Sequence, residues 1–285
     1  EFRRVLFRSP GAQHVLLLSG GLLGAVREAA KYPAATITLV ETDPEVLRLV
    51  ASLDPSARDP RVRLVADDPR ALIRCHPGAF DAIVSAMPDP LSLGANRFFT
   101  AEFFQQARRA LRAGGVLGIG LGASENLTTA QDKTTLGSVA SALRAEFSHV
   151  TAVPGARVRF AASDAPLESR VDRALLAAGI PAIYVTPAWF SERFSPGRVD
   201  ALAAAMASPA PPNRDFLPVT FSGAAAKWAA MAGGRWAALA AAALLLGLIL
   251  AVVAFTRERA VSAAIAGSGF ARSEERRGGK ECRLG

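Results

Sequence analysis

QHVLLLSGGLLGAVREAAKYPAATITLVE, residues 13–41, is the stretch that decides the fold. It begins with an apolar run at 13–18, which leads into a glycine-containing turn at 19–24. A helical stretch at 25–31 follows, and a second apolar run, rich in β-branched residues, spans Thr36–Glu41. Apolar runs that alternate with helices are typical of a parallel sheet covered on both faces. The stretch therefore predicts the first strand–helix–strand unit of an α/β domain.

The same alternation continues along the chain. Three further apolar runs are predicted to be buried strands: Val62–Ala66, Phe80–Ser85 and 115–121. A helix is expected to begin after Asp43, with this aspartate as N-cap and Pro44 in the first helical position. Another helix, at 100–112, ends at glycines. Together these elements predict an α/β fold with a doubly wound, Rossmann-like parallel sheet.

The end of this domain is predicted to be a helix and a hairpin. Residues 138–147 are expected to form the last helix, with Ser138 as its N-cap. The segments 150–153 and 157–162 would form an edge hairpin, and a later strand is expected at 182–185. Residues 208–213, SPAPPN, are the clearest linker. The predicted organisation is a nucleotide-binding domain at 10–165, a C-terminal α/β extension at 166–207, a linker and juxtamembrane segment at 208–234 and a transmembrane helix at 236–255.

The predicted transmembrane helix has twenty residues without a charged side chain. This length crosses a hydrocarbon core of ~30 Å at ~1.5 Å per residue. The alternative is a buried core helix, but such a helix rarely stays apolar on every face. Basic residues flank both ends (Arg235, Arg257 and Arg259), so the charge pattern does not decide the orientation.

The charge distribution argues against nucleic-acid binding. The net charge is +8. Both termini, EFRRVLFRS at 1–9 and RSEERRGGKECRLG at 272–285, resemble translated sequencing-adapter sequence and are left out of the fold prediction. The remainder has 25 basic and 21 acidic residues and no basic stripe. Cys75 is then the only cysteine, and the histidines have no ligand spacing, so neither a disulfide framework nor a metal site is expected.

Polar residues at three successive strand ends indicate a nucleotide site. In a doubly wound sheet a ligand binds beyond the carboxyl ends of the strands. Gly20 and Gly21 would let the backbone approach the ligand. Glu41, twenty residues past Gly21, could accept both ribose hydroxyls. Asp68 could accept the amino group of an adenine. The alternative for Glu41 is a solvated strand end, whereas neighbouring Asp43 is expected to be only a helix cap.

These residues stand in a chain that resembles the spermidine/spermine synthases, the polyamine aminopropyltransferases. The resemblance runs over residues 14–121 and rests on HVLLLSGGLLGAVREAAKYP, TLVETDPEV, DPRVRLVADD, FDAIVSAMPDP and FFTAEFFQQARRALRAGGVL. Beyond it, GASENLTT, SDAPL and PPNRDFLPVTF resemble the membrane-fused branch, in which further membrane helices surround the domain. The resemblance implies a fold of the S-adenosylmethionine-dependent methyltransferase type. It also implies that the chain is a fragment that lacks the family's small N-terminal β domain.

The resemblance assigns roles to individual residues. Glu41 would hold the ribose of decarboxylated S-adenosylmethionine and Asp68 its adenine, with Gly20 and Gly21 lining the cofactor. Asp89, in Pro-Asp-Pro, would contact a small-molecule amine substrate. No metal is implied, and the resemblance is compatible with a homo-oligomer.

Three positions depart from the family pattern. The aspartate that serves as the base is Ala86 here, and the aspartate that binds the amine end of the cofactor is Leu22. Pro69 replaces a residue with a backbone N–H group. Glu125, just past the fifth strand, could supply a substitute catalytic carboxylate, or it could be a surface loop residue.

Three hypotheses remain open. The first is an aminopropyltransferase-like enzyme, slow or altered in substrate. The second is a methyltransferase-like enzyme that uses S-adenosylmethionine itself. The third is a catalytically degenerate nucleotide-binding module of a membrane protein. In each case the α/β domain is expected on the cytoplasmic side, where adenosyl cofactors are found.

Overall fold

The computed structural model describes residues 12–123, 129–167, 187–231 and 239–256. The chain divides into two compact units, Glu1–Ala225 and Ala226–Gly285. The strand expected at 182–185, the two terminal segments and Glu125 lie outside the described residues.

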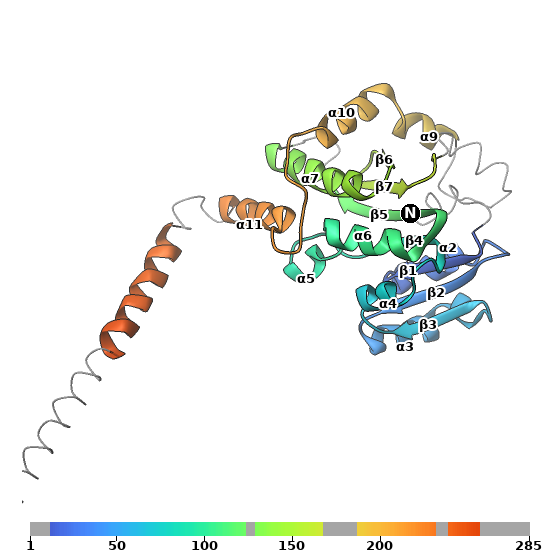
Figure 1. The fold of residues 1–285 in the computed structure, drawn as a ribbon, viewed down its shortest axis with the longest axis horizontal. Coiled ribbons are helices and arrows are strands. Elements are labelled where there is room, and N and C mark those ends of the chain that lie inside the picture. The colour runs from blue at the N-terminus through green and yellow to red at the C-terminus, as the bar shows by residue number, and fades with distance from the viewer. Residues whose placement is uncertain (1–11, 124–128, 168–186, 232–238, 257–285) are drawn as a thin grey trace, which may run out of the picture. The chain divides into compact units, whose positions relative to one another are not determined.

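The first unit is built on a seven-stranded sheet with the order β3-β2-β1-β4-β5-β7-β6 (Figure 1). The first five strands are parallel to one another and alternate with helices, as predicted. Their bounds are β1 His14–Leu18, β2 Thr36–Glu41, β3 Val62–Ala66, β4 Phe80–Ser85 and β5 Leu111–Gly122. The order reverses between β1 and β4, which is where a doubly wound sheet opens a crevice for a ligand.

The edge hairpin is also confirmed. Strands β6 (His149–Val153) and β7 (Arg157–Ser163) are antiparallel, and β7 pairs with β5, so the hairpin extends the sheet at one edge.

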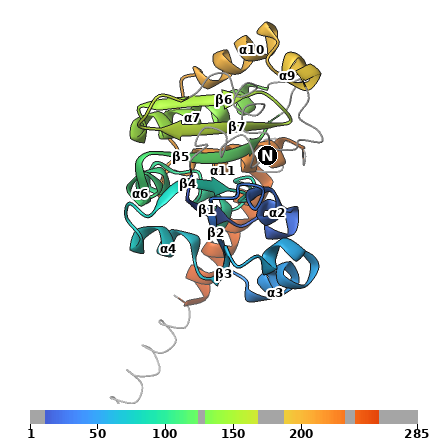
Figure 2. The ribbon, with the colours of Figure 1, turned by 90° about the vertical axis from the view of Figure 1, so that its right-hand side faces the viewer.

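Helices cover both faces of the sheet. Successive side chains of each strand point to opposite faces, so each strand offers apolar side chains to the helices on either face. Leu17 and Leu39 face one apolar cluster with α2 (Ala25–Ala29) and α3 (Pro44–Leu53). Leu16 and Leu18 face the other, with helices α4, α6 and α7. Figure 2 shows α2 and α3 on one side of the sheet and α4 and α6 on the other. The bounds of the helices on this second face are α4 Pro69–Cys75, α6 Ala101–Ala110 and α7 Ala130–Glu146.

Helix α7 begins eight residues before its predicted start, so Ser138 as an N-cap was wrong. Thr129 and Asp132 form a capping box that stabilises the true N-terminus. Ser138 is instead fully buried within the helix, and its hydroxyl donates to the Pro211 carbonyl (2.7 Å). The predicted cap at Asp43 is confirmed for α3, and Thr100 caps α6, a role that was not assigned to it from the sequence.

The helices that remain in the first unit follow the sheet or connect it: α5 Leu93–Asn96, α9 Pro187–Arg193, α10 Pro196–Met206 and the start of α11 Val219–Met231. Helix α10 packs on α7. Between α10 and α11 runs a segment that we call the strap, residues 208–218. The SPAPPN sequence favoured a linker here, but the strap is bonded to the domain at many points.

Asn213 anchors the strap. Its side chain has no exposed surface, and its amide donates to Asn96 Oδ1 (3.1 Å) and to the Phe99 carbonyl (2.9 Å). Its own carbonyl accepts from the N–H group of Ala101 (2.9 Å), and its Oδ1 from that of Thr220 (3.3 Å). A buried amide with every donor and acceptor bonded fixes the backbone around it.

In the described part of the second unit, the helix Leu239–Thr256 is long and apolar enough to cross a membrane. Its mean hydropathy is 2.7, and none of it is buried against the rest of the chain. Its bounds agree with the predicted span 236–255 as far as the described residues reach.

Candidate functional site

The candidate site lies at the carboxyl edge of the parallel strands. Ser19 and the glycine turn follow β1, Glu41 ends β2, and Asp68 lies just past β3. Asp89 follows β4, beyond the half-buried Ala86. The topology therefore brings the residues predicted from sequence to one edge of the sheet.

The glycine turn folds back onto the end of β2. Ser19 (φ +62°) and Gly20 (φ +85°) both have left-handed backbones. This conformation is uncommon for serine, and it occurs mainly where neighbouring contacts enforce it. Here the Ser19 N–H group donates to the Val40 carbonyl (3.0 Å), and its hydroxyl donates to Glu41 Oε1 (2.9 Å). The backbone of Gly20 and Gly21 also hydrogen-bonds the Glu41 carboxylate.

The Glu41 side chain is largely buried at the end of β2. Its residue is 8% exposed. Burial raises the pKa of Glu41 above its ordinary value of 4.5, and the hydrogen bonds from Ser19, Gly21 and Gly20 offset only part of that effect. A carboxylate in such a position gains from additional hydrogen-bond donors. The geometry fits a ligand that brings hydroxyl groups to the exposed edge of Glu41.

Asp68 is the N-cap of α4 and is clamped from two sides. Its Oδ1 accepts the N–H groups of Arg70 (2.8 Å) and Ala71 (3.1 Å). The guanidinium of Arg97 donates to Oδ1 (3.0 Å) and lies 2.9 Å from Oδ2. Burial alone would raise the pKa of Asp68, but the hydrogen bonds from Ala71, Arg97 and Arg70 and the charge of Arg97 outweigh it and hold this pKa below its ordinary value.

Asp68 retains room for one more donor. Each carboxylate oxygen has about two lone pairs in the carboxylate plane. Oδ1 is shared among three donors, whereas Oδ2 is contacted by Arg97, and the side chain is 36% exposed. The exocyclic amino group of an adenine fits this remaining position.

Asp89 is already paired with a cation. Its Oδ1 accepts from the Gly122 N–H group (2.8 Å) and lies 2.8 Å from Nη2 of Arg157, while Oδ2 accepts from Nη1 (3.2 Å). Arg157 also donates to the Gly120 carbonyl (3.0 Å), so it is fixed on the end of β5. A Cβ atom at Gly122 would overlap the Asp89 carboxylate. An amine that binds Asp89 must therefore compete with Arg157.

Ala86 and Leu22, which the family resemblance places where aspartates are expected, lie at the glycine turn and the end of β1. The Ala86 N–H group donates to the Leu18 carbonyl (2.9 Å), which places Ala86 next to the start of the glycine turn. Leu22 is 51% exposed and Leu23 75% exposed. The surface around the turn is thus apolar where the family resemblance implies carboxylates.

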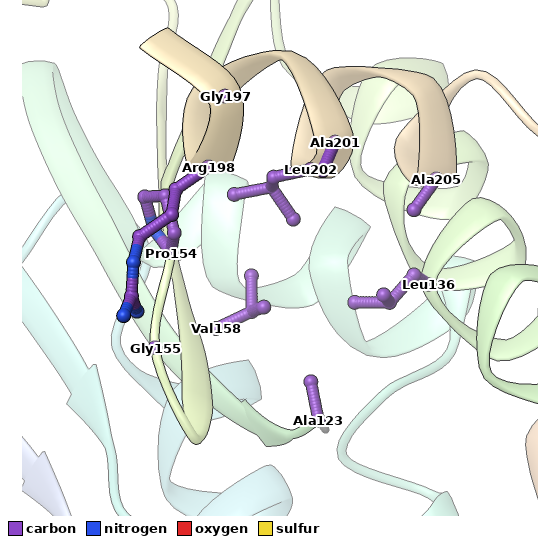
Figure 3. A pocket seen from close by; sticks show the side chains of 10 residues that line it. All are labelled: Ala123, Leu136, Pro154, Gly155, Val158, Gly197, Arg198, Ala201, Leu202 and Ala205. Carbon is purple, nitrogen blue, oxygen red and sulfur yellow. The ribbon is translucent and has the colours of Figure 1, made fainter. Parts of the chain in front are cut away.

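An apolar cavity of about 160 Å³ lies on the α7 side, near the end of β5 (Figure 3). Val158, Leu136 and Leu202 point into it, and Arg198 lies at its side. Val158 follows Arg157 in β7, so the two side chains lie on opposite faces of the sheet. The cavity is therefore separated by the sheet from the Asp89–Arg157 pair.

Three residues at this edge were not assigned a role from the sequence. They are Arg97, Arg157 and Ser19, the last of which hydrogen-bonds Glu41. The serine stands within the quoted glycine turn and could have been singled out there. The two arginines could not, because each reaches its carboxylate from a distant part of the chain. Within the described residues no group of three or more metal-binding side chains occurs.

Comparisons with known proteins identify the family of the chain. A family model described as the spermine/spermidine synthase domain matches residues 4–151. The polyamine aminopropyltransferase of Korarchaeum cryptofilum is 34% identical over 110 residues, which are 37% of this chain and 34% of that protein. The chain thus aligns with about a third of the length of the curated relatives it matches.

Solved structures show the same fold. A spermidine synthase in complex with the transition-state analogue AdoDATO superposes with a TM-score of 0.57 at 20% identity, over 70% of this chain and 72% of that one. Human methyltransferase-like protein 13 in complex with SAH superposes with a TM-score of 0.51 at 18% identity, over 67% and 95%. The methyltransferase-type fold predicted from sequence is confirmed.

Proposed function

The chain belongs to the spermine/spermidine synthase family, and from that premise we propose that its α/β domain binds an adenosyl sulfonium co-substrate and transfers a group from it to a small-molecule acceptor. Decarboxylated S-adenosylmethionine, with transfer of an aminopropyl group to an amine, is the first candidate. Gly20 and Gly21 line the co-substrate, Glu41 accepts its ribose hydroxyls, and Asp68 accepts its adenine amino group.

The observation that carries the proposal is the pair of carboxylates at adjacent strand ends. Glu41 is buried among hydrogen-bond donors of the glycine turn, and Asp68 is fixed by Arg97 with one acceptor position open. A structural helix cap would account for the backbone bonds of Asp68. It would not account for the ordered, partly open carboxylate, nor for a buried acid at the end of β2.

Aminopropyl transfer makes a defined demand on the acceptor side. The lone pair of the acceptor nitrogen forms the new C–N bond while the C–S bond breaks, and the sulfur keeps the bonding pair and becomes a neutral thioether. An alkyl amine has a pKa of about 10, so a base must remove a proton. Ala86 cannot do this. Asp89 and Glu125 are the carboxylates proposed to act in its place, and Asp89 must first exchange Arg157 for the substrate.

A second candidate follows from the Asp89–Arg157 pair. Since this aspartate is already balanced by a guanidinium, the acceptor side is poorly suited to a polycation. The half-exposed Leu22 likewise offers no charge for the amine end of decarboxylated S-adenosylmethionine. These features favour S-adenosylmethionine itself as donor and an acceptor that needs no strong base. A catalytically degenerate module is the third possibility, which the binding test below separates from an inactive fold.

We further propose that the helix Leu239–Thr256 spans a bilayer and that the α/β domain lies on the cytoplasmic side. The hydropathy of this helix and its lack of buried surface support the span, and the cytoplasmic origin of adenosyl cofactors supports the orientation.

Calorimetry on the purified full chain in mild detergent tests the proposed function. Methylthioadenosine, S-adenosylmethionine and its decarboxylated form are titrated separately. Binding of at least one is expected, and Glu41→Ala should lose about 1.5–3 kcal/mol because it removes a charge-assisted contact. Asp43→Asn, which changes an exposed helix cap beside the site, is the matched control. A folded sample that binds none of the three ligands would refute the proposal.

A further inference from the structure

A polar network links the strap to the candidate adenine carboxylate. Asp215, on the strap, receives the guanidinium of Arg70 through two parallel contacts, Nη1–Oδ1 (2.9 Å) and Nη2–Oδ2 (3.0 Å). Thr100 donates its hydroxyl to the same Oδ1 (2.8 Å), and Glu102 accepts the Asp215 N–H group (3.0 Å). The Arg70 side chain is only 7% exposed, so Asp215 is the carboxylate that balances a buried charge.

Arg70 reaches Asp68 in two ways. Its N–H group donates directly to Asp68 Oδ1, as part of the helix cap. Its Nη1 also donates to the backbone carbonyl of Arg97 (3.1 Å). The same Arg97 places its guanidinium on Asp68. Asp215 of the strap therefore fixes the side chain of Arg70, which hydrogen-bonds the backbone carbonyl of Arg97. The side chain of Arg97 in turn fixes the Asp68 carboxylate.

We propose that Arg97 and Asp215 are positioning residues for nucleobase recognition. They orient the Asp68 carboxylate so that the open acceptor position on Oδ2 faces the 6-amino group of a bound purine. The proposal rests on the proposed function, because it assigns Asp68 to the adenine. Arg97 acts on Asp68 directly, and Asp215 acts through Arg70 and the backbone of residue 97.

The geometry distinguishes positioning from general stability. Arg97 is 38% exposed, and besides pairing with Asp68 its guanidinium lies 5.2 Å from the centroid of the Phe98 ring, so its loss removes one ring contact but no buried ion pair. The Asp68 cap also retains its two backbone donors without Arg97. What Arg97 adds is the orientation of the carboxylate, because its two nitrogen atoms contact both oxygens.

The test compares two ligands that differ only at the 6-position of the purine. Dissociation constants are measured for 5′-methylthioadenosine and for the matching purine riboside thioether that lacks the amino group. A hydrogen bond to a charged acceptor makes the first ligand about tenfold to a hundredfold tighter in the unmodified chain. In Arg97→Gln and Asp215→Asn this ratio should fall by about threefold to tenfold. Asp215→Glu, which keeps the charge that Arg70 faces, should recover most of it.

The control variant is Asp164→Asn, which removes a comparable ion pair between Asp164 and Arg108 (2.7 Å) at another part of the domain. It should leave the ratio unchanged. A structural role alone would weaken both ligands equally in the variants and leave the ratio at its original value, which would overturn the inference. If Asp215→Asn does not fold, Arg97→Gln and Asp215→Glu decide the question. Failure of the unmodified chain to bind either ligand would refute the proposed function instead.

Discussion

At the scale of single residues, two acids of the candidate site have opposite electrostatic environments. Burial raises the pKa of Glu41, while the donors around Asp68 lower its pKa. Asp68 therefore resists protonation more than an ordinary aspartate does. Glu41 is the acid of this pair whose protonation can change with ligand binding.

The affinity for the nucleoside should depend on pH through Glu41. Ribose hydroxyls donate to the ionised carboxylate, so binding weakens as the pH is lowered toward the raised pKa, above 4.5. In the ligand-free chain the sign is opposite. The contribution of Glu41 to stability is fully present below pH 4.5 and is lost as the pH rises through the raised pKa. Calorimetry between pH 7.5 and 5 measures how the affinity for the nucleoside depends on pH. Glu41→Gln should bind weakly at every pH, and an equal slope in both proteins would contradict the assignment.

A carboxylate at position 86 should increase aminopropyl transfer. If the unmodified chain transfers little to putrescine or spermidine, Ala86→Asp, with Leu22→Asp where the amine end also needs a partner, should raise the rate. A general base contributes about 10²–10⁴-fold. Partial burial beside Met87 would raise the pKa of the new acid and reduce the gain. Ala86→Asn, of the same size but without a base, is the control, and product formation is followed by chromatography.

The opposite result is equally informative. Turnover in the unmodified chain that Asp89→Ala or Glu125→Ala abolishes would show that the base has moved to one of these positions. Turnover that neither substitution affects would contradict both interpretations.

At the scale of elements, the strap is the part of the chain whose structure differs most from its sequence pattern. SPAPPN is typical of a linker, yet Pro211, Asn213 and Asp215 all bond to the domain. Gly137 in α7 permits this approach, because a Cβ atom there would lie 2.5 Å from the Ser208 carbonyl oxygen. The strap is thus a structural element of the α/β unit.

Asn213→Ala should therefore destabilise the domain. It leaves the buried Asn96 Oδ1, the Phe99 carbonyl and the Thr220 N–H group each with one bond fewer. The expected loss is about 1.5–4.5 kcal/mol in the free energy of unfolding, since three buried hydrogen bonds are removed at about 0.5–1.5 kcal/mol each. Denaturant titration of the full chain measures it.

Arg214→Ala is the neighbouring control. The Arg214 side chain is 54% exposed and pairs with Glu102 at 3.4 Å, so its loss should cost less than about 1 kcal/mol. Equal effects of the two substitutions would show that the strap is not anchored by Asn213.

At the scale of the whole molecule, the chain joins an α/β unit to a second unit whose described part is a membrane-length apolar helix. The strap lies just before α11, so the segment that leads toward the second unit is the same one that holds Arg70. A membrane anchor in the second unit would thus be linked along the chain, through the strap, to the polar network around Asp68.

The orientation of the domain can be tested with its exposed thiol. Cys75 at the end of α4 is exposed, and Cys282 is changed to serine so that it does not contribute. A membrane-impermeant maleimide should label Cys75 in inside-out vesicles but not in sealed right-side-out vesicles. Cys75→Ser controls for unspecific labelling. Labelling from the outside only, or recovery of the chain in the soluble fraction without detergent, would contradict the proposed topology.

The sequence by itself determined the local elements and their order. The five parallel strands, the hairpin and the cap at Asp43 follow from apolar runs and from residues that bond their own backbone neighbours. These are short-range effects, so the residues that cause them stand next to each other in the chain. The positions of Glu41 and Asp68 at strand ends followed from the same pattern, as did the family resemblance.

Only the tertiary structure decided which side chains meet. The pairs Asp89–Arg157 and Arg70–Asp215 join residues that are 68 and 145 positions apart. Ser138 was misread for the same reason, since its partner is the Pro211 carbonyl, 73 positions away. Such contacts depend on which helix packs against which strand, and this packing is set by the hydrophobic core of the folded domain. A linear pattern of polar residues does not contain it, because the free energy that orders those side chains comes from burial of apolar groups elsewhere.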